Sequence, residues 1–561
     1  MNILGISYNY HDAAACLVRD GRPVAAAEEE RFTRVKHDAR FPAQAAAYCL
    51  QAAGASSSGL DAIAFYEKPA RKLARVLQFA KAGLPDSAAY FTAQFSGLVD
   101  EGILAEQVIR ETLDFTGPVY FCEHHLSHAA SAFYVSPFEQ AAILTVDGVG
   151  EWATSAQFYG DGAQIIKRRE MHYPHSLGLF YSSLTAYLGF KVNDDEYKVM
   201  GLASYGQPRF RTAFEKLITT HADGSFALCL PYFAFMLGGG KMFTAALEEL
   251  LGPARRAHEP IEERHRDIAA TLQEVTEDIL VAMARFCRAQ ETSENLCLAG
   301  GVAQNCVANS RILQRAGFKN LFIQPAPGDA GAAMGAALWA SHEVLHAPRT
   351  PAAHHTFLGP EFTEAEMLTA LHKFGLDYEK LDEDTLCARV AAMIHNRLIV
   401  GWFQGRMEFG PRALGARSIL ANPCAADMKD ILNLRVKFRE EFRPFAPAVV
   451  EEAAADYFRL DGESTFMLFT PQVREEMAAE IPSVTHVDGT ARVQTVSRAQ
   501  NPLFHKLIKA FGDISGTPIL INTSFNIRGE PIVCTPDDAI KCFLGTDIDF
   551  LAMGPFLVSK V

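Results

Sequence analysis

Hydrophobic residues cluster in three short runs at the start of the chain. Residues 3–8, 13–18 and 24–27 are rich in Ile, Leu, Val and Ala, and Asp20 with Gly21 separates the second run from the third. Short apolar runs bounded by polar turns are typical of β-strands. The beginning of the chain therefore predicts three successive strands joined by turns.

The same arrangement returns further along the chain. Residues 142–147, 155–159 and 164–167 predict three more strands, and their spacing differs by one residue from that of the first set. This repetition predicts an internal duplication, as a two-lobed α/β fold with a central nucleotide cleft would need. Two unrelated hairpins are the alternative.

Two glycine-containing segments follow the second set. An apolar run ends in Gly300 and Gly301, at the start of a predicted helix that includes Asn305. Glycines at such a junction let backbone amides approach a nucleotide closely, although they are more often a packing device. Residues 325–331 form a predicted tight loop that holds Asp329.

A change of composition divides the chain into two predicted domains. Residues 347–355 contain prolines and small residues, as a linker does, and a predicted helix at 386–396 and strand at 398–403 follow it. We expect domains at 1–354 and 355–561.

Length, charge and cysteine content narrow the class of protein. With 561 residues the chain exceeds what one hydrophobic core usually supports, and its 49% hydrophobic share is that of a globular protein. The net charge of −14 argues against nucleic acid or an anionic membrane as the main partner. Neither a secretory signal nor an apolar run of membrane-spanning length is recognised, so we expect a cytoplasmic protein. The 11 cysteines include no C-x-x-C pair and suggest neither disulfides nor a thiolate zinc site.

A histidine pair is the first candidate for chemistry. His124 and His128 stand one helical turn apart, although 18 histidines should give such a pair by chance roughly half the time. With Asp147 and Asp329 they form a donor set that suits Fe(II) or Zn(II). A zinc-protease motif does not fit, because His125 replaces the required glutamate. The alternative is that these histidines only pack or cap a helix.

The turn after the first strand holds a second candidate. His11 lies in this turn, and Lys36 follows an acidic stretch. A histidine there could act as a general base toward a hydroxyl, because its pKa lies near the working pH. A solvent-exposed turn histidine is the more common case.

The second domain carries the densest basic region. Arg406, Arg412 and Arg417 stand in a Gly-rich loop, and residues 435–443 add four more cations. From Arg406 to Arg443 there are eight basic residues against five acidic ones. Because guanidinium groups match phosphate oxygens, we expect a phosphorylated small molecule here. A solvated charged helix is the alternative.

A predicted strand supplies further polar groups to the second domain. Residues 519–528 begin as a buried strand and end in Asn522, Thr523 and Ser524. Their amide and hydroxyl groups suit the same predicted pocket.

Five segments together resemble the O-carbamoyltransferase family that includes nodulation-factor and antibiotic-tailoring enzymes. They occur in one order and span nearly the whole chain: residues 124–133, 197–206, 300–301, 406–418 and 522–526. The resemblance implies a first domain similar to the tRNA threonylcarbamoyl-transfer protein, with the duplicated actin/Hsp70/sugar-kinase-like (ASKHA) fold, and a YrdC-like α/β second domain.

The resemblance also implies roles for individual residues. The metal ligands would be His124, His128, Asp147 and Asp329, with iron as the metal. Carbamoyl phosphate and ATP would be handled by Arg412, Lys437, Arg443, Arg492 and Ser524, to which we add Arg528 from its position. His11 and Lys36 match acceptor-side positions, with His11 as the expected base. The nucleotide part would lie against Gly300, Gly301 and Asn305.

The activity implied by the resemblance is ATP-dependent O-carbamoyl transfer. The second domain would form carbamoyl adenylate from carbamoyl phosphate and ATP, with Mg(II) accompanying the nucleotide. The first domain, with Fe(II) or another divalent metal, would pass the carbamoyl group to a hydroxyl of a sugar, aminoglycoside or polyketide acceptor. We expect residues 66–109 and 230–257 to shape the acceptor pocket, and a homodimer is possible.

Three alternatives remain open at this point. A sugar-kinase-like phosphotransferase would not need the basic second domain and would release ADP. A tRNA threonylcarbamoyl transferase is disfavoured by the acidity of the chain. A non-enzymatic metal-binding or scaffold protein is disfavoured by the polar groups in both domains.

Overall fold

The computed structural model describes residues 1–83, 104–237, 240–349, 355–440 and 442–560. The chain divides into two units. The first comprises Met1–Glu29 with His37–His354, and the second comprises Glu30–Lys36 with His355–Val561.

The first unit contains two five-stranded sheets, and the first of them uses the strands expected at the start of the chain. Its strand order is β3-β2-β1-β4-β5. The first three strands pair antiparallel, and β4 and β5 join them in parallel. The five strands are β1 (Asn2–Ser7), β2 (Ala14–Arg19), β3 (Arg22–Glu28), β4 (Ala62–Phe65) and β5 (Val119–Phe121).

The second sheet repeats the first strand for strand. Its order is β8-β7-β6-β11-β12, again with three antiparallel strands followed by two parallel ones. Its strands are β6 (Gln140–Val146), β7 (Ala153–Asp161), β8 (Gln164–His172), β11 (Asn295–Ala299) and β12 (Asn320–Ile323). The predicted duplication is therefore confirmed, and the first unit has the duplicated ASKHA-like fold.

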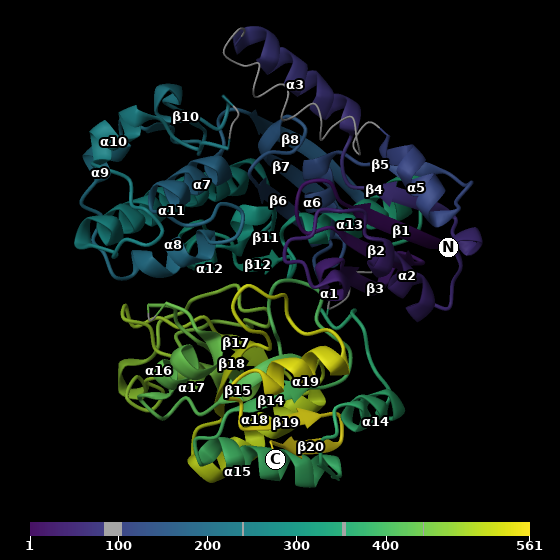
Figure 1. Ribbon diagram of the computed structural model, residues 1–561. Coiled ribbons are helices and arrows are strands. Elements are labelled where there is room, and N and C mark those ends of the chain that lie inside the picture. Colours follow the sequence, from purple (N-terminus) through teal and green to yellow (C-terminus); the bar gives the residue numbers. More distant parts are fainter. Residues whose placement is uncertain (84–103, 238–239, 350–354, 441, 561) are drawn as a thin grey trace. The chain divides into compact units, whose positions relative to one another are not determined.

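One helix follows the last strand of each repeat, and the two helices are exchanged. Helix α6 (His124–Phe133) follows β5 of the first repeat but packs on β6, β7 and β11 of the second. Helix α13 (Asp329–Trp339) follows β12 of the second repeat but packs on β1, β2 and β4 of the first. The two helices also pack against each other, between the sheets (Figure 1).

Two glycines allow this close packing. A Cβ on Gly335 of α13 would lie 1.7 Å from the carbonyl oxygen of Ser127 in α6. A Cβ on Gly5 of β1 would lie 1.9 Å from the carbonyl oxygen of Ala333 in α13. Since no side chain fits in either place, Gly335 lets α13 approach α6 closely, and Gly5 lets α13 approach β1.

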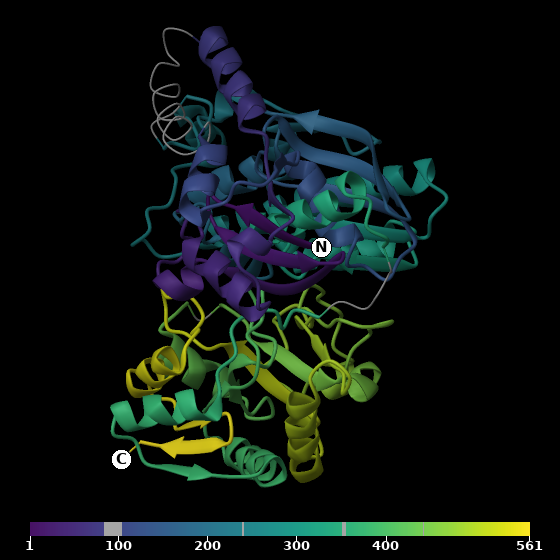
Figure 2. The ribbon, with the colours of Figure 1, turned by 90° about the vertical axis from the view of Figure 1, so that its right-hand side faces the viewer.

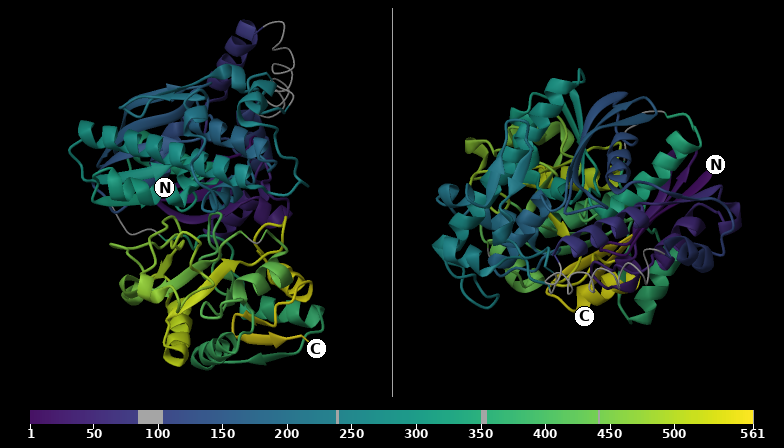
Figure 3. Two further views of the ribbon diagram at one scale, coloured as in Figure 1. Left: turned by 90° about the vertical axis from the view of Figure 1, so that its left-hand side faces the viewer. Right: turned by 90° about the horizontal axis from the view of Figure 1, so that it is seen from above.

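The other helices of the first unit surround the two sheets. Helix α2 (Ala43–Ala52) packs on β2 and β3, and the long α11 (Glu263–Gln290) lies beside α8 (Glu196–Ala203) and α12 (Cys306–Arg315) (Figure 3). The remaining elements of this unit are α3 (Pro69–Gly83), α5 (Ala105–Leu113), α7 (Leu177–Tyr187), α9 (Arg211–Phe214), α10 (Ala245–Leu251), and the hairpin β9 (Ile218–Thr220) and β10 (Phe226–Leu228).

The second unit is built on one mixed sheet of eight strands. The order is β13-β20-β19-β14-β15-β18-β16-β17, with β13 at the edge beside the C-terminal β20 (Figure 2). Its strands are β13 (Tyr378–Lys380), β14 (Val400–Phe403), β15 (Arg417–Ala421), β16 (Ala446–Val450), β17 (Gln494–Val496), β18 (Ile519–Ser524), β19 (Phe550–Met553) and β20 (Phe556–Ser559).

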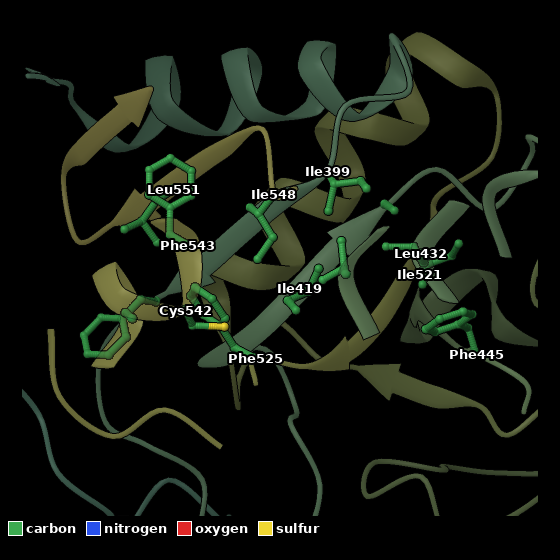
Figure 4. Packing of buried hydrophobic residues seen from close by; sticks show 14 of the residues in the cluster. Ile399, Ile419, Leu432, Phe445, Ile521, Phe525, Cys542, Phe543, Ile548 and Leu551 are labelled. Carbon is green, nitrogen blue, oxygen red and sulfur yellow. The ribbon is translucent and has the colours of Figure 1, made fainter. Parts of the chain in front are cut away.

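Helices cover both faces of this sheet. Along β14, Val400 and Trp402 join the core on one face, while Ile399 and Phe403 join the core on the other, as the two-residue period of a strand requires. Helices α15 (Glu383–His395) and α18 (Pro502–Ser515) cover the first face, and α14 (Glu364–Lys373) and α19 (Pro536–Leu544) the second. Figure 4 shows the packing of the second core around Ile419, Phe525 and Phe543. Two short helices, α16 (Met428–Leu432) and α17 (Ala454–Tyr457), complete this unit.

One segment belongs to a different unit from the one that the sequence indicated. Glu30–Lys36, which includes the short α1 (Glu30–Thr33), lies within predicted domain 1–354 but packs with the second unit. The guanidinium of Arg34 donates to the carbonyl oxygens of Pro531 and Ile532, at 2.7 Å each. These distant main-chain contacts carry no signature in the local sequence, so the prediction was wrong for this segment.

Candidate functional sites

Four side chains converge in the first unit. His124 and His128 lie on the first turns of α6, Asp329 begins α13, and Asp147 directly follows β6. The Nε2 atoms of both histidines lie 3.0 and 3.1 Å from Oδ2 of Asp147, and 3.6 and 3.4 Å from Oδ1 of Asp329. The two Nε2 atoms are 3.1 Å apart. All four groups predicted as metal ligands are therefore together, and the His residues and Asp329 are buried.

The spacing of these donor atoms fits a divalent transition metal. Ligand atoms about 2.1 Å from a shared ion lie about 3.0–3.4 Å from one another for right-angled to tetrahedral geometry. The neighbouring distances in this cluster run from 3.0 to 3.6 Å. Two imidazole nitrogens that face each other so closely repel unless a proton or a cation lies between them. The residues present therefore fit a metal, and two nitrogen and two oxygen donors suit Fe(II) or Zn(II).

Backbone amides hold Asp147 in position. Its Oδ1 accepts hydrogen bonds from the amides of Gly148, at 2.8 Å, and Gly301, at 3.2 Å. This leaves Oδ2 facing the imidazoles. The first turn of α6 is fixed in a similar way, because the buried carboxylate of Glu151 accepts from the amide of His124. Such outer contacts orient metal ligands.

Charge in the cluster favours a cation. Burial alone would lower the pKa of His128, but its hydrogen bonds to Asp147 and Asp329 raise it to about 9. Burial would raise the pKa of Asp147, yet the two imidazoles hold it well below its usual range. His125 points elsewhere, to Thr145 and the carbonyl of Ala153, and burial lowers its pKa to about 3.

The two glycines and Asn305, predicted to contact the nucleotide, have partners within the protein. Gly300 donates its amide to the carbonyl of Pro327, and Gly301 donates to Asp147. Gly300 has φ of +92°, and a Cβ there would lie 2.2 Å from the carbonyl oxygen of Val146. Asn305 caps α12. These contacts match the packing role of glycines at a strand–helix junction. A contact of these residues with the nucleotide stays a prediction.

His11 lies in the turn between β1 and β2, as expected, and it has an acidic partner. Its Nδ1 is 2.9 Å from Oδ2 of Asp12. Burial would lower the pKa of His11, but Asp12, and more weakly Asp329 and Asp147, raise it to about 9. Lys36 stands at the end of the Glu30–Lys36 segment and so belongs to the other unit.

The topology of the second unit gathers its basic residues at one end of the sheet. Strands β15 and β16 both pair antiparallel with β18, and β17 runs parallel to β16. The segments before β15, β16 and β17 therefore meet the segment after β18. These segments carry the predicted phosphate-handling residues Arg412, Lys437, Arg443, Arg492 and Arg528, and Ser524 is the last residue of β18.

Lys437 joins two of these segments. Its Nζ lies 2.6 Å from the carbonyl oxygen of Ser524, 3.2 Å from the Ser524 hydroxyl and 2.8 Å from Oδ1 of Asn526. Burial, with the nearby guanidinium groups of Arg439 and Arg443, lowers the pKa of Lys437 well below its usual range. The structure thus brings Lys437 and Ser524 together, with Arg443 close by.

Glu440 links two further predicted residues. Arg443 approaches its Oε2 at 3.5 Å, and Arg528 approaches its Oε1 at 3.6 Å. Arg412 stands on the loop between β14 and β15, and Arg492 stands two residues before β17. Their part in binding stays a prediction.

Two arginines of the basic loop have a structural role instead. Arg417 is fully buried and donates to the carbonyls of Gln404, Gly405 and Pro360, with its guanidinium 3.7 Å from the centre of the Phe403 ring. Arg406 donates to the carbonyl of Leu358 at 2.7 Å. Our expectation that the whole set would face a phosphate was therefore wrong for Arg417, because a residue without exposed surface cannot meet a ligand.

Two family models match the chain in the same order as the two units. The model described as "Carbamoyltransferase N-terminus" matches residues 2–338, and "Carbamoyltransferase C-terminus" matches residues 391–560. The chain belongs to the carbamoyltransferase family. Its resemblance to this family is therefore confirmed, and the chain is a transferase.

Relatives of this carbamoyltransferase match over most of its length. It is 40% identical to nodulation protein NolNO of Sinorhizobium fredii over 98% of this chain and 79% of that protein. An uncharacterized protein of Synechocystis is 45% identical, over 100% of this chain and 97% of its own. Nodulation protein U of Rhizobium tropici is 28% identical, over 97% and 94% respectively.

Solved structures match the carbamoyltransferase more distantly. ROK hexokinase from Thermus thermophilus has 16% identity and a TM-score of 0.30, over 61% of this chain and 100% of the hexokinase. HypF of T. kodakarensis has 16% identity and a TM-score of 0.31, over 61% of this chain and 48% of HypF.

Sequence reasoning missed the partners of the candidate base in this carbamoyltransferase. Asp12 binds both His11 and His37, and His37 also meets Asp194. Only the adjacency of His11 and Asp12 could have suggested part of this set. Asp194 lies 157 positions from His37 in the sequence, so no local pattern connects them.

The predicted acceptor pocket and the predicted location of the carbamoyltransferase are tested only in part. Of the predicted acceptor-pocket segments, residues 84–103 and 238–239 lie outside the described residues. Within the described part of the chain, every helix is too short or too polar to cross a bilayer. Residence in the cytoplasm and a homodimer stay predictions.

Proposed function

We propose that this carbamoyltransferase forms carbamoyl adenylate from carbamoyl phosphate and ATP in its second unit. Its first unit then transfers the carbamoyl group to a hydroxyl of a small-molecule acceptor. The observation that carries the proposal is the pair of sites with different chemistry. The four metal-type donors lie in the first unit, and the basic side chains gather at one sheet end of the second.

The second unit suits the activation step. Carbamoyl phosphate and ATP are both polyanions, and guanidinium groups are good partners for phosphate oxygens. Water first cleaves carbamoyl phosphate to carbamate and inorganic phosphate. A carbamate oxygen then attacks the α-phosphorus of ATP, the α–β phosphoanhydride bond breaks, and pyrophosphate leaves. Arg443 and Lys437 would stabilise the charge that develops on these oxygens, with Mg(II) accompanying the nucleotide.

The first unit suits the transfer step. The acceptor oxygen attacks the carbamoyl carbon of the adenylate, and AMP leaves with the electron pair of the broken C–O bond. Nε2 of His11 would take the proton of the attacking hydroxyl, because Nδ1 is held by Asp12. A divalent metal, Fe(II) or another ion, would polarise the carbonyl or bind a phosphoryl oxygen when present between His124, His128, Asp147 and Asp329.

The acceptor is a small molecule with a hydroxyl, of the sugar, aminoglycoside or polyketide type. Relatives of the chain include nodulation proteins, and the family that its motifs resemble includes nodulation-factor and antibiotic-tailoring enzymes, which favours this class of acceptor. The acidic net charge of −14 favours a small acceptor over tRNA.

The test measures both products of the nucleotide. The iron-loaded protein is incubated with carbamoyl phosphate, ATP and a panel of sugars, polyols and polyketide alcohols. Pyrophosphate and AMP that depend on carbamoyl phosphate are expected, together with a carbamoylated member of the panel. ADP in place of AMP would indicate a kinase-like phosphotransferase. No dependence on carbamoyl phosphate would contradict the proposal.

Two variants separate the half-reactions. Arg443→Ala is expected to abolish pyrophosphate formation, because it removes a cation from the activation site. Asp329→Ala is expected to lower the metal content and block transfer while pyrophosphate still forms. Equal behaviour of both variants in the first half-reaction would contradict a scheme with two sites.

A further inference from the structure

The imidazoles of His11 and His37 share one carboxylate, that of Asp12. Oδ2 of Asp12 lies 2.9 Å from Nδ1 of His11, and Oδ1 of Asp12 lies 2.7 Å from Nδ1 of His37. The other ring nitrogen of His37 lies 3.1 Å from Oδ1 of Asp194. The four side chains therefore form one chain of hydrogen bonds, His11–Asp12–His37–Asp194, all within the first unit.

The backbone near these four hydrogen-bonded side chains adopts left-handed conformations at several residues. Asn9, Asp12, His37 and Asn193 all have positive φ, at +80°, +53°, +56° and +59°. Asn and Asp adopt the left-handed region more readily than other non-glycine residues, so His37 is the residue whose conformation local preference explains least. Such residues cluster at functional sites.

Main-chain hydrogen bonds hold two of these loops together. The amide of Asn9 donates to the carbonyl of Ala39, and the amide of Ala13 donates to the carbonyl of Asp38, each at 2.8 Å. The turn that carries His11 and Asp12 is thus fastened on both sides to the loop that carries His37. The relative positions of the two imidazoles are set by the backbone and not by their side chains alone.

The contacts determine where protons lie. Both nitrogens of His37 face carboxylate oxygens, which only accept, so His37 carries two protons and a positive charge. On His11, Nδ1 donates to Asp12, so Nε2 is the nitrogen that exchanges a proton. Because Asp12 lies between two rings, the charge of His37 offsets part of its pull on the proton of His11.

We infer that His37 and Asp194 are positioning residues that act through Asp12 to set the tautomer and proton affinity of His11. This inference rests on the proposed function, in which His11 accepts the proton of the acceptor hydroxyl. Without the charge of His37, the whole negative charge of Asp12 would act on His11, and the imidazole would release its proton less readily. Asp194 keeps His37 charged.

Within the first unit, the following further groups near these four side chains do not replace this coupling. Asp147 and Asp329 act on His11 more weakly than Asp12 does. Lys191 approaches Asp194 at 3.1 Å, but its side chain is 72% exposed, so solvent screens its charge. The ring of Tyr10 lies 4.6 Å from that of His11 and adds no charge.

The experiment titrates the histidines of the full-length chain directly. Nitrogen-15 labelled imidazoles are followed by NMR from pH 5 to pH 10, and signals of His11 and His37 are assigned from His11→Gln and His37→Gln. In the unaltered chain, His11 is expected as the Nδ1–H tautomer above its pKa. In His37→Gln and in Asp194→Asn, the pKa of His11 is expected to rise by at least about 0.5 units.

A neighbouring carboxylate supplies the matched control. Asp195 lies on the same loop but pairs with Lys198 at 2.8 Å, so Asp195→Asn disturbs the loop without touching His37. Its His11 pKa is expected to stay unchanged. An unchanged His11 pKa in both His37→Gln and Asp194→Asn, or an equal shift in all three variants, would overturn the inference.

The same samples distinguish this inference from the proposed function. Failure of the unaltered chain to make pyrophosphate from carbamoyl phosphate and ATP would contradict the function while leaving the titration result valid. Pyrophosphate formation by all variants, with no change in the His11 titration, would leave the function intact and contradict the positioning role.

Discussion

At the scale of single residues, the metal-type cluster depends on where each side chain points as much as on residue type. His124, His125 and His128 lie on one helix, yet only the first and third turn Nε2 toward Asp147. The ring of His125 binds Thr145 and a main-chain carbonyl instead. Adjacent histidines on this helix therefore have different roles.

This difference gives a matched pair of substitutions. His128→Gln is expected to reduce bound metal from about one ion per chain to a small fraction, because a ligand is removed from a buried site. His125→Gln is expected to retain the metal, although the loss of its buried contacts lowers stability. Metal content by mass spectrometry after iron loading provides the measurement. Equal metal content in the two variants would contradict the assignment of His128.

The proton affinity of His11 predicts the pH dependence of transfer. The imidazolium form cannot accept a proton, and the pKa of His11 is raised to about 9. The rate of acceptor carbamoylation at low acceptor concentration should therefore rise about tenfold per pH unit below the pKa and level off above it. A cation held by Asp147 and Asp329 would offset their charge and lower the pKa of His11, so the rising part of the pH–rate profile would move to lower pH. The measurement is initial product formation between pH 6 and pH 10.

Asp12 provides the control for this profile. Asp12→Asn removes the carboxylate that favours the charged imidazole, so the rising limb should move down toward the ordinary histidine value near 6.5. The maximal rate should fall as well, because the tautomer of His11 is no longer fixed. If the rising part of the pH–rate profile does not move in Asp12→Asn, a group other than His11 controls the rate.

At the scale of elements, the contact between α6 and α13 positions the metal-type donors. Gly335→Ala would place a Cβ 1.7 Å from the carbonyl oxygen of Ser127 and force the helices apart. We expect a loss of about 1–3 kcal/mol in the free energy of unfolding and weaker metal binding. Urea unfolding and metal titration are the measurements. In Gly59→Ala the nearest atom to the new Cβ is 3.5 Å away, so this control should change neither.

The buried carboxylate of Glu408 anchors the loop before β15. Oε1 of Glu408 accepts from the amides of Leu414 and Ala416, at 2.7 Å each, and of Arg417 at 3.2 Å. Glu408→Gln weakens these charge-assisted bonds and should lower the free energy of unfolding by about 1–3 kcal/mol. It should also raise the KM for ATP in pyrophosphate formation, because Arg412 lies on this loop. An unchanged KM in the folded variant would separate the loop from the nucleotide site.

The sequence predicted some elements well and others not at all, for physical reasons. The six strands of the two repeats follow from short apolar runs bounded by polar turns, and the four metal-type donors were named correctly as neighbours. The packing of α6 and α13 on each other's repeats could not be predicted from the sequence, because it depends on glycines that contact residues far away in the chain. The burial of Arg417 was missed for the same reason, since carbonyl acceptors such as that of Pro360 leave no pattern in composition.

At the scale of the whole molecule, the two half-reactions of the proposed function use different units of one chain. Carbamoyl adenylate hydrolyses readily in water, so an intermediate released into solution would be lost. A mixture of Arg443→Ala and Asp329→Ala chains should therefore make pyrophosphate through the second variant but little carbamoylated acceptor. The measurement compares product per pyrophosphate with that of the unaltered chain. Full recovery of product would show that the intermediate passes freely between chains.

The exchanged helices also bear on how such a site could have arisen. His124 and His128 belong to the helix that ends the first repeat, whereas Asp147 and Asp329 belong to the second. A protein consisting of one repeat would hold only the two histidines or only the two carboxylates, and an identical copy would supply the same pair again. The order of events in the ancestry of the chain is thereby constrained. This donor set of two histidines and two carboxylates arose only after the gene had doubled and its two halves had diverged.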